Sequence, residues 1–253
     1  MKFKHVRWSL GIMAVAAMAF LGGVAHGQDD PPEGFRSLFN GEDFTGWVVP
    51  EGDGGHWQVI DGVIDYDAQS EAPGEKHLWT EEEFEDFELH IEWRLKETPW
   101  VNPSVPIIKP DGTTKLDENG EPITVAIPDS DSGILPRGYP KAQVNIWCWP
   151  IGSGEFWGYR TDGDVSDEVR AAVTPKRNAD NDIGEWNKFE IRVVDNVVTV
   201  HLNGFEVIDE AELPGLPESG PIGIQSHGHM EDGEWQSSPS LIQCRNIFIK
   251  ELD

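Results

Sequence analysis

The stretch Phe87-Glu-Leu-His-Ile-Glu-Trp-Arg-Leu95 alternates apolar and polar residues without a break. A period of two predicts a β-strand whose apolar side packs on a hydrophobic core. The other side carries two carboxylates, an imidazole and a guanidinium, on Glu88, His90, Glu92 and Arg94. Two interpretations of this polar row stay open. It either lines a ligand-facing surface in a sandwich of two sheets, or it is a solvated face with a cross-strand ion pair.

The rest of the chain also favours strands over helices. Gly and Pro together are frequent, with 27 and 18 residues, and apolar residues alternate more often than they recur at helical spacing. Asn203-Gly204 is a strong signal for a two-residue hairpin turn, and Asp195-Asn196 separates two further strand-like segments. Only Glu81–Asp86 is expected to form a helical turn. The pattern predicts an all-β protein, an antiparallel β-sandwich or jelly roll.

The N-terminus has the organisation of a secretory signal peptide. Lys2, Lys4 and Arg7 form a basic region, and an uncharged, mostly apolar run follows over residues 9–24. Small residues before Gln28 permit cleavage there. We therefore expect a signal peptide over residues 1–27, a single domain over 28–253, and a periplasmic or extracellular location. An uncleaved membrane anchor is the alternative.

One segment interrupts the regular strands. Residues 97–130 are rich in Pro and Gly and contain a polar tip at Lys115–Gly120. Val105–Ile108 and Ile123–Ile127 are expected to pair as a protruding hairpin. We interpret the segment as an insertion on the rim of the domain.

Charge and cysteine content limit the partners. The formal net charge of −27 disfavours binding to nucleic acid or to an anionic membrane surface. Beyond the signal peptide, no membrane association is expected, and the sequence leaves the oligomeric state open. Cys148 and Cys244 are the only cysteines. They either form a disulfide or pack as two buried thiols.

The segment Gln143-Val-Asn-Ile-Trp-Cys-Trp149 has a polar face of a distinctive kind. Gln143, Asn145, Trp147 and Trp149 share one side, so that amides and indole rings lie on the same face. Amides hydrogen-bond to hydroxyl groups and indole rings stack on sugar rings, which predicts a saccharide-binding surface. The alternative is an edge strand with its Trp residues wedged under the insertion. The neighbouring sequence adds further candidates for substrate binding, namely Arg137, Glu155, Trp157 and Tyr159.

Six sequence blocks, in the same order, resemble one known family. They are Phe39–Trp47, Phe87–Arg94 with Asp131–Ile134 and Arg137, Gly184–Asn187, Leu202–Gly204, Gly220–Gln225 with His227, and Arg245–Ile247. The chain resembles the 3-keto-disaccharide hydrolase domain family, also called 3-keto-glucoside lyase/hydratase. The resemblance covers nearly all of the chain after the predicted signal peptide.

The resemblance implies a concanavalin A-like (laminarinase-like) jelly roll with a sugar cleft on its concave sheet. It also implies an exported enzyme, a hydrolase or lyase, that cleaves glycosides already oxidised at C3. A C3 ketone acidifies the C2–H bond, so a modest base can remove that proton. The enolate then expels the C1 substituent and water adds back, while an Arg or a divalent metal ion of unknown identity holds the oxyanion.

We expect Glu92 or His227 to serve as the base or as a metal ligand, with Arg94 and Arg137 holding the substrate oxygens. His90, Glu92, Arg94, Gln143 and Asn145 should then share one concave face. Asp131 is considered only as a loop ligand for Ca²⁺, and His229, which has no third ligand nearby in sequence, is expected to be solvated.

The sequence departs from the family pattern at Gln143, where Glu is common. An amide cannot act as a base, so a carbohydrate-binding, lectin-like module without turnover is the main alternative. A third possibility is a structural or adhesive sandwich that uses residues 97–130 as its partner surface.

Overall fold

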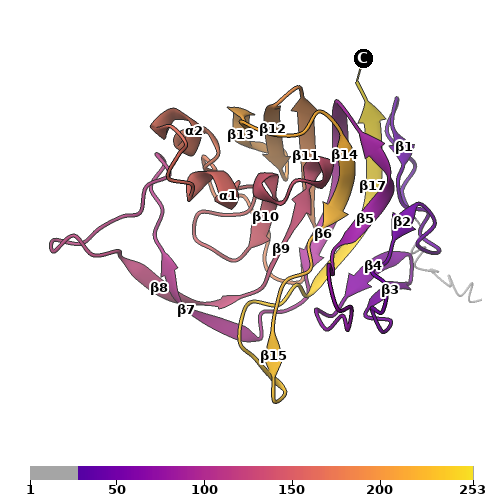
Figure 1. Ribbon diagram of the computed structural model, residues 1–253, viewed down its shortest axis with the longest axis horizontal. Coiled ribbons are helices and arrows are strands. Elements are labelled where there is room, and N and C mark those ends of the chain that lie inside the picture. The colour runs from indigo at the N-terminus through magenta and orange to yellow at the C-terminus, as the bar shows by residue number, and fades with distance from the viewer. Residues whose placement is uncertain (1–27, 253) are drawn as a thin grey trace, which may run out of the picture.

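The computed structural model describes residues 28–252, and the predicted signal peptide lies outside the described residues. Two antiparallel sheets pack face to face (Figure 1). The strands of the larger sheet are β1 (Arg36–Ser37), β3 (Trp57–Ile60), β4 (Val63–Tyr66), β6 (Phe87–Leu95), β11 (Asn187–Val194), β12 (Val197–Leu202), β13 (Phe205–Glu212) and β17 (Ile242–Glu251). Their order is β13-β12-β11-β6-β17-β4-β3, with β1 paired to β17.

The smaller sheet has five strands in the order β10-β9-β14-β5-β2. Their bounds are β2 (Trp47–Val48), β5 (Leu78–Phe84), β9 (Asp131–Leu135), β10 (Val144–Trp147) and β14 (Gly220–Ile224). Two hairpins lie outside the sheets, β7 (Trp100–Pro106) with β8 (Thr124–Asp129) and β15 (Met230–Glu231) with β16 (Glu234–Trp235). The helical segments are two 3₁₀ turns, η1 (Pro136–Gly138) and η2 (Pro140–Ala142), and two short helices, α1 (Trp157–Arg160) and α2 (Asp167–Ala172).

The core lies between the sheets, and the predicted all-β sandwich is confirmed. The apolar members of β6 are between 0% and 3% exposed, and the strand pairs with β11 and β17. From the opposite sheet, Val144 and Ile146 of β10 are fully buried against the same core. Alternation on both sheets therefore produces a single hydrophobic layer, as it does in other sandwiches.

The predicted hairpins are also present. β11 and β12 pair across Asp195-Asn196, and β12 and β13 pair across Asn203-Gly204. Asn203 and Gly204 both have positive φ, at 53° and 79°, which a two-residue type I′ turn requires. The helical turn expected at Glu81–Asp86 is wrong, because these residues continue β5 and enter the turn before β6.

The insertion forms the hairpin expected from the sequence, with Val105 opposite Val125. It reaches away from the sandwich and then approaches α2 (Figure 1). Gly112 lies so close to α2 that a Cβ there would be 2.7 Å from side-chain and backbone atoms of Arg170. The hairpin is therefore in contact with the body of the protein at this point.

Candidate functional site

The outer face of the five-stranded sheet carries a hollow of about 530 Å³, which we call the cleft. Three neighbouring strands form its floor. Asn145 and Trp147 of β10 lie opposite Gly133 and Asp131 of β9, and Gln225 follows β14 with its backbone N–H bonded to Gly133. The cleft is lined by Asp131, Pro140, Lys141, Gln143, Asn145, Trp147, Trp149, Trp157, Gly158, Gln225 and His227.

Three amides form a row across the floor of the cleft. Gln143 Nε2 lies 2.5 Å from Asn145 Oδ1, 2.8 Å from Gln225 Oε1 and 3.2 Å from the Ser132 carbonyl oxygen. A Cβ at Gly133 would lie 2.6 Å from Gln143 Cγ, so glycine makes room for this side chain. Asn145 is only 4% exposed, and its Nδ2 donates to no residue that the structure describes. A buried donor without a protein partner can bind a water molecule or an oxygen of a bound molecule.

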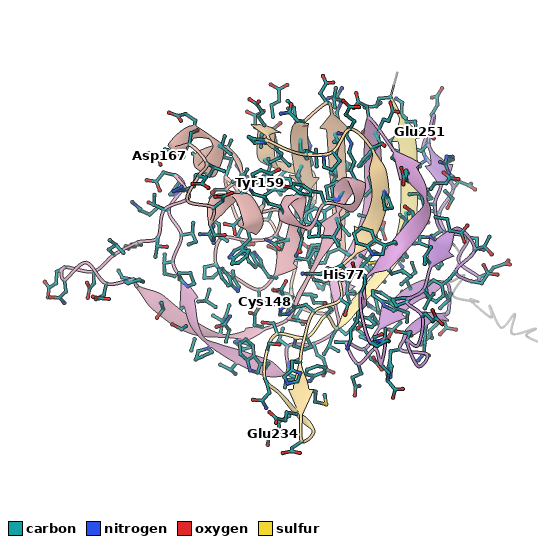
Figure 2. All side chains as sticks on the ribbon, viewed as in Figure 1. His77, Cys148, Tyr159, Asp167, Glu234 and Glu251 are labelled. Carbon is teal, nitrogen blue, oxygen red and sulfur yellow. The ribbon has the colours of Figure 1, made fainter. Side chains whose placement is uncertain are left out.

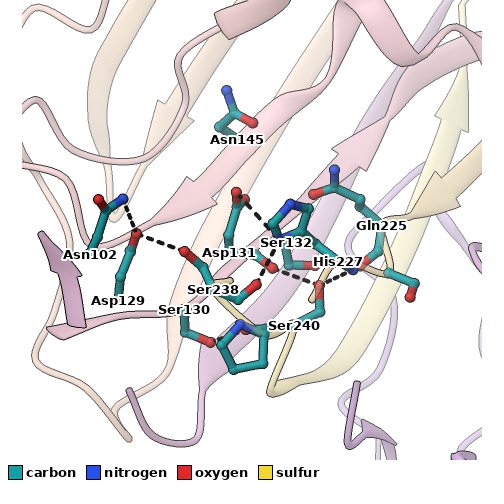
Figure 3. Close-up of polar contacts among 12 residues, drawn as sticks. Asn102, Asp129, Ser130, Asp131, Ser132, Asn145, Gln225, His227, Ser238 and Ser240 are labelled. Atoms are coloured by element: carbon teal, nitrogen blue, oxygen red, sulfur yellow. Dashed lines mark hydrogen bonds and ion pairs between the residues drawn. The ribbon is translucent and has the colours of Figure 1, made fainter. Parts of the chain in front are cut away.

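The loop after β16 fixes the ring of His227. Its Nδ1 lies 2.6 Å from the Ser238 carbonyl oxygen, and its backbone N–H donates to Ser240 Oγ at 2.7 Å (Figure 3). A carbonyl oxygen only accepts, so Nδ1 must carry the hydrogen. Neutral His227 therefore has its lone pair on Nε2, the nitrogen that can act as a base.

Asp131 lies beside this histidine. Its Oδ2 is 3.9 Å from His227 Nδ1, and its Oδ1 is closed off from solvent and accepts no hydrogen bond from residues 28–252, although 23% of the side chain is exposed (Figure 3). Burial raises the pKa of Asp131 to about 7; His227 opposes this shift and Asp129 adds to it. Asp131 belongs to β9, so the loop calcium ligand considered from the sequence is in fact a strand residue.

Indole rings form one wall of the cleft. Trp147 and Trp149 stack with their ring centres 4.2 Å apart and their planes 1° apart. Both N–H groups are used within the protein, by the Gly152 carbonyl oxygen and by Asp129. Trp157 on α1 is 48% exposed, which leaves a flat apolar surface free for a bound molecule.

Comparison with known proteins identifies the family and the fold of the chain. A family model described as a 3-keto-alpha-glucoside-1,2-lyase-like domain matches residues 34–250. The chain belongs to this family. No curated protein matches the chain.

Solved structures similar to this lyase-like domain include two proteins from Parabacteroides distasonis, each described as a "putative glycosyl hydrolase". One is 23% identical, with a TM-score of 0.56 over 87% of this chain and 85% of the other. The second is 19% identical, with a TM-score of 0.53 over 87% of this chain and 95% of the other. At these identities the likeness establishes a shared fold.

In the lyase-like domain, two of the predicted catalytic residues lie far from the cleft. Glu92 and Arg94 belong to β6 in the larger sheet, whereas Gln143 and Asn145 belong to the smaller one. The predicted shared face is therefore wrong. Alternation reveals which side of a strand is buried, but both sheets of a sandwich bury one side, so it does not tell in which sheet a strand lies.

The polar row of β6 forms contacts within the outer face of its own sheet. Glu92 Oε2 accepts a hydrogen bond from Arg245 Nε at 2.8 Å. Arg94 donates to Gln243 at 2.7 Å and lies 4.6 Å from the ring centre of Trp186. The expected cross-strand ion pair is therefore present, but the face is not fully solvated, because His90 is buried and Glu88, Glu92 and Arg94 are only partly exposed.

Three predicted substrate-binding residues are buried away from the cleft. Arg137 is 3% exposed and bonds to Asp86 and to three backbone carbonyl oxygens. Glu155 is fully buried in an ion pair with Arg160 at 2.6 Å. Tyr159 is fully buried and donates to the Pro214 carbonyl oxygen (Figure 2). These polar groups have internal partners, which the local sequence does not reveal.

The predictions for the other residues agree better with the structure. Gln143, Asn145, Trp147, Trp157 and His227 all line the cleft. Trp149, which shares the polar face of the Gln143–Trp149 segment, lines it as well. Sequence reasoning missed Lys141 and Gln225, and it did not place Asp131 in the site. For Gln225 a signal existed, because it continues the alternation of β14 on the side opposite Ile222 and Ile224.

Two further aromatic residues extend the same face. His77 Nδ1 accepts the backbone N–H of Ser226, and burial lowers the pKa of His77, with His227 adding to the shift. Trp79 of β5 lies across Gly223 of β14, where a Cβ would be 2.5 Å from the indole ring. The His77-x-Trp79 alternation was the available signal for both.

The donors in the cleft do not fit a dedicated metal site. No group of three or more His, Cys, Asp or Glu residues within the described part of the chain is placed to hold a metal ion. The cleft offers one imidazole and one carboxylate, and its other oxygens belong to amides. Separately, none of the helices in residues 28–252 has the length and apolar character to cross a membrane.

Proposed function

We propose that the domain cleaves 3-keto-glycosides by eliminating the C1 substituent, with His227 removing the C2 proton. The observation that carries this proposal is the fixed tautomer of His227. Its Nδ1–H is held by the Ser238 carbonyl oxygen, so the lone pair of Nε2 is available in a cleft that belongs to a lyase-like family. A ketone at C3 acidifies the C2–H bond enough for an imidazole to act as the base.

The enolate that forms carries negative charge on the C3 oxygen and needs hydrogen-bond donors. Asn145 Nδ2 is buried and has no partner within residues 28–252, so it is free to donate to that oxygen. Side-chain amides serve this purpose in other enzymes, where removing one donor costs about 10²–10³ in rate. Asn145 replaces Arg94 and Arg137 in the role that the sequence had indicated for them.

The walls of the cleft suit an uncharged sugar. Trp157 offers an exposed indole ring, and Gln143 and Gln225 offer amides for hydroxyl groups. Lys141, the one cationic residue of the lining, pairs with Asp162, so the lining offers no unpaired lysine or arginine to an anionic substrate. Addition of water to the unsaturated product would complete a net hydrolysis, and release before that addition would give a lyase.

Location in the cell is part of the same proposal. The signal peptide predicted over residues 1–27 would direct the domain to the periplasm or the extracellular space. The N-terminal sequence of the protein recovered from those fractions should begin at Gln28. A chain that retains residues 1–27 in the membrane fraction would favour the anchor instead.

A carbohydrate-binding module without turnover is the second candidate. It is favoured by Gln143, an amide at the position where the family commonly has Glu. Incubation of the purified protein with a 3-keto-glucoside separates the two candidates, because only an enzyme consumes it. The assay is run with and without chelator, and binding to immobilised glycans is measured in parallel.

The His227→Gln variant tests the mechanism. Loss of the base should lower kcat by about 10²–10⁴ while sugar binding persists. Glu92→Gln is the matched control, because that carboxylate pairs with Arg245 on the other sheet and turnover should be unchanged. Full activity in His227→Gln would reject the mechanism, and glycan binding without any wild-type turnover would favour the binding module.

A further inference from the structure

Asp131 is the single carboxylic acid in the lining of the cleft. The same loop that fixes His227 also fixes this residue. The backbone N–H of Asp131 donates to the Pro239 carbonyl oxygen at 3.1 Å, and its carbonyl oxygen accepts from Ser240 Oγ at 2.6 Å. One short segment, residues 238–240, therefore holds an imidazole and a carboxyl group next to each other (Figure 3).

The surroundings of Asp131 favour its protonated form. Its Oδ1 is sealed from solvent and accepts no hydrogen bond from the described residues, so an anion would lose hydration at Oδ1 without gaining a hydrogen bond there. Asp129 of β8 differs, since it accepts hydrogen bonds from Asn102, Ser238, Trp149 and the backbone of Cys148. Two neighbouring carboxyl groups thus have contrasting environments, a pattern that separates proton donors from permanent anions.

The groups facing Asp131 come from several elements. His227 after β14 favours the anion, and Asp129 of β8 disfavours it. His77, which lies before β5 and faces Glu75 at 3.3 Å, has its pKa lowered mainly by burial, and His227 adds to that shift. The balance raises the pKa of Asp131 to about 7, where a carboxylic acid can still donate a proton at neutral pH.

We infer that Asp131 is the general acid of the cleft and protonates the departing glycosidic oxygen. This inference rests on the proposed function. His227 Nε2 takes the C2 proton, and the electron pair of that bond forms the C2–C3 double bond of the enolate. The C3 carbonyl then re-forms, the pair moves to make the C1–C2 double bond, and the C1–O bond breaks. The leaving oxygen keeps that bond's electrons and receives the proton of Asp131.

The products are an alcohol and an unsaturated 3-keto sugar, and no oxidant or reductant is consumed. The imidazolium and the carboxylate that remain return to their starting states when a proton passes from one to the other. A general acid indicates that the substrates are glycosides of alkyl or sugar alcohols. These alcohols are poor leaving groups and need protonation, whereas a nitrophenolate leaves without it.

The test compares two leaving groups. Wild type, Asp131→Asn and the control Glu92→Gln are assayed on the methyl and the 4-nitrophenyl 3-keto-glucosides. Asp131→Asn should lower kcat/KM by about 10²–10³ on the methyl glycoside and by less than about tenfold on the nitrophenyl glycoside. Glu92→Gln should match wild type on both.

Wild type supplies a second measurement that needs no variant. Its rate on the methyl glycoside should fall as pH rises above about 7, where Asp131 loses its proton, and its rate on the nitrophenyl glycoside should not fall. Equal losses on both substrates in Asp131→Asn, or identical pH profiles in wild type, would overturn the role of Asp131 alone. Absence of wild-type turnover on both glycosides would overturn the proposed function together with it.

Discussion

Glu155 and Arg160 form a buried ion pair that is not part of the cleft lining. Their side chains are 0% and 6% exposed, and Arg160 Nε donates to Glu155 Oε1 at 2.6 Å. Two backbone hydrogen bonds join this segment to Asn145 of β10. The N–H of Asn145 donates to the Glu155 carbonyl oxygen, and the N–H of Gly154 donates to the Asn145 carbonyl oxygen. The pair therefore helps to hold the strand that carries the amide row, without touching the cleft itself.

Glu155→Gln should destabilise the fold rather than the chemistry. The substitution leaves the Arg160 guanidinium buried without its counter-ion, which costs about 3–5 kcal/mol in comparable pairs. Urea denaturation measures this loss of unfolding free energy. Glu118→Gln, on the exposed tip of the insertion, is the control and should leave the midpoint unchanged. A variant as stable as wild type would contradict the structural role.

Asp131 should make stability depend on pH. Its folded-state pKa, about 7, lies above the ordinary value of 3.8, so the folded protein holds a proton that the unfolded chain releases. This contribution favours folding fully below pH 3.8 and is lost as pH rises through 7. Asp131→Asn removes the dependence. The Tm of Asp131→Asn should therefore exceed that of wild type by more at pH 8 than at pH 5. An equal difference at the two pH values would contradict the assignment.

At the scale of elements, α1 illustrates how a short helix divides its residues between core and cleft. Tyr159 and Phe156 point into the interior, while Trp157 is left half exposed over the floor. Gly158 contacts η2 so closely that a Cβ would lie 2.6 Å from the Lys141 carbonyl oxygen. The helix is thus fixed against the segment that leads into β10, and the position of Trp157 follows.

Trp157→Ala and Trp147→Ala should give opposite results. Trp157 is 48% exposed, so its loss should weaken sugar binding with little effect on the free energy of unfolding. Trp147 is 5% exposed and stacked on Trp149, so its loss should cost about 3–5 kcal/mol. Glycan affinity and urea denaturation of both variants provide the comparison. Equal loss of stability in both would mean that Trp157 is a core residue.

At the scale of the whole molecule, the two sheets present two different outer faces. The face of the larger sheet carries ion pairs such as Glu92–Arg245, and the face of the smaller sheet carries the cleft. The chain has an excess of acidic residues, but only one of them lines the cleft. The overall charge is therefore compatible with an uncharged substrate. The β7–β8 hairpin adds a projection whose exposed Val101 and Leu116 lie outside the cleft lining.

The two cysteines should remain reduced thiols. Cys148 follows β10 and Cys244 lies within β17 of the other sheet, and both are free. Burial raises the pKa of Cys148 to about 12 and also raises that of Cys244, so neither forms a reactive thiolate readily. Intact mass and Tm should therefore be the same with and without reductant. A mass increase of two hydrogens on reduction would reveal a disulfide instead.

The amino-acid sequence by itself determined which residues face the core. Alternation in β6, β10 and β11, together with the Asn203-Gly204 turn, led to the sandwich, because a buried strand face and a tight turn are local requirements. Local chemistry also predicted that the amide and indole side chains of β10 belong to the site. His227 was predicted because its sequence block resembles that of the family.

Only the tertiary structure decided which strands share a sheet, and hence which polar groups meet. Glu92 and Gln143 have similar local patterns, yet the pairing order places them on opposite sheets. Arg137 bonds to backbone carbonyl oxygens distant in the chain, and Glu155 pairs through one carboxyl oxygen with Arg160 on a helix that the sequence did not reveal. Asp131 became a candidate for the same reason, since its partner His227 lies 96 positions away and only folding brings them to 3.9 Å. Sheet order and long-range pairing depend on how whole surfaces pack, which no short stretch of sequence encodes.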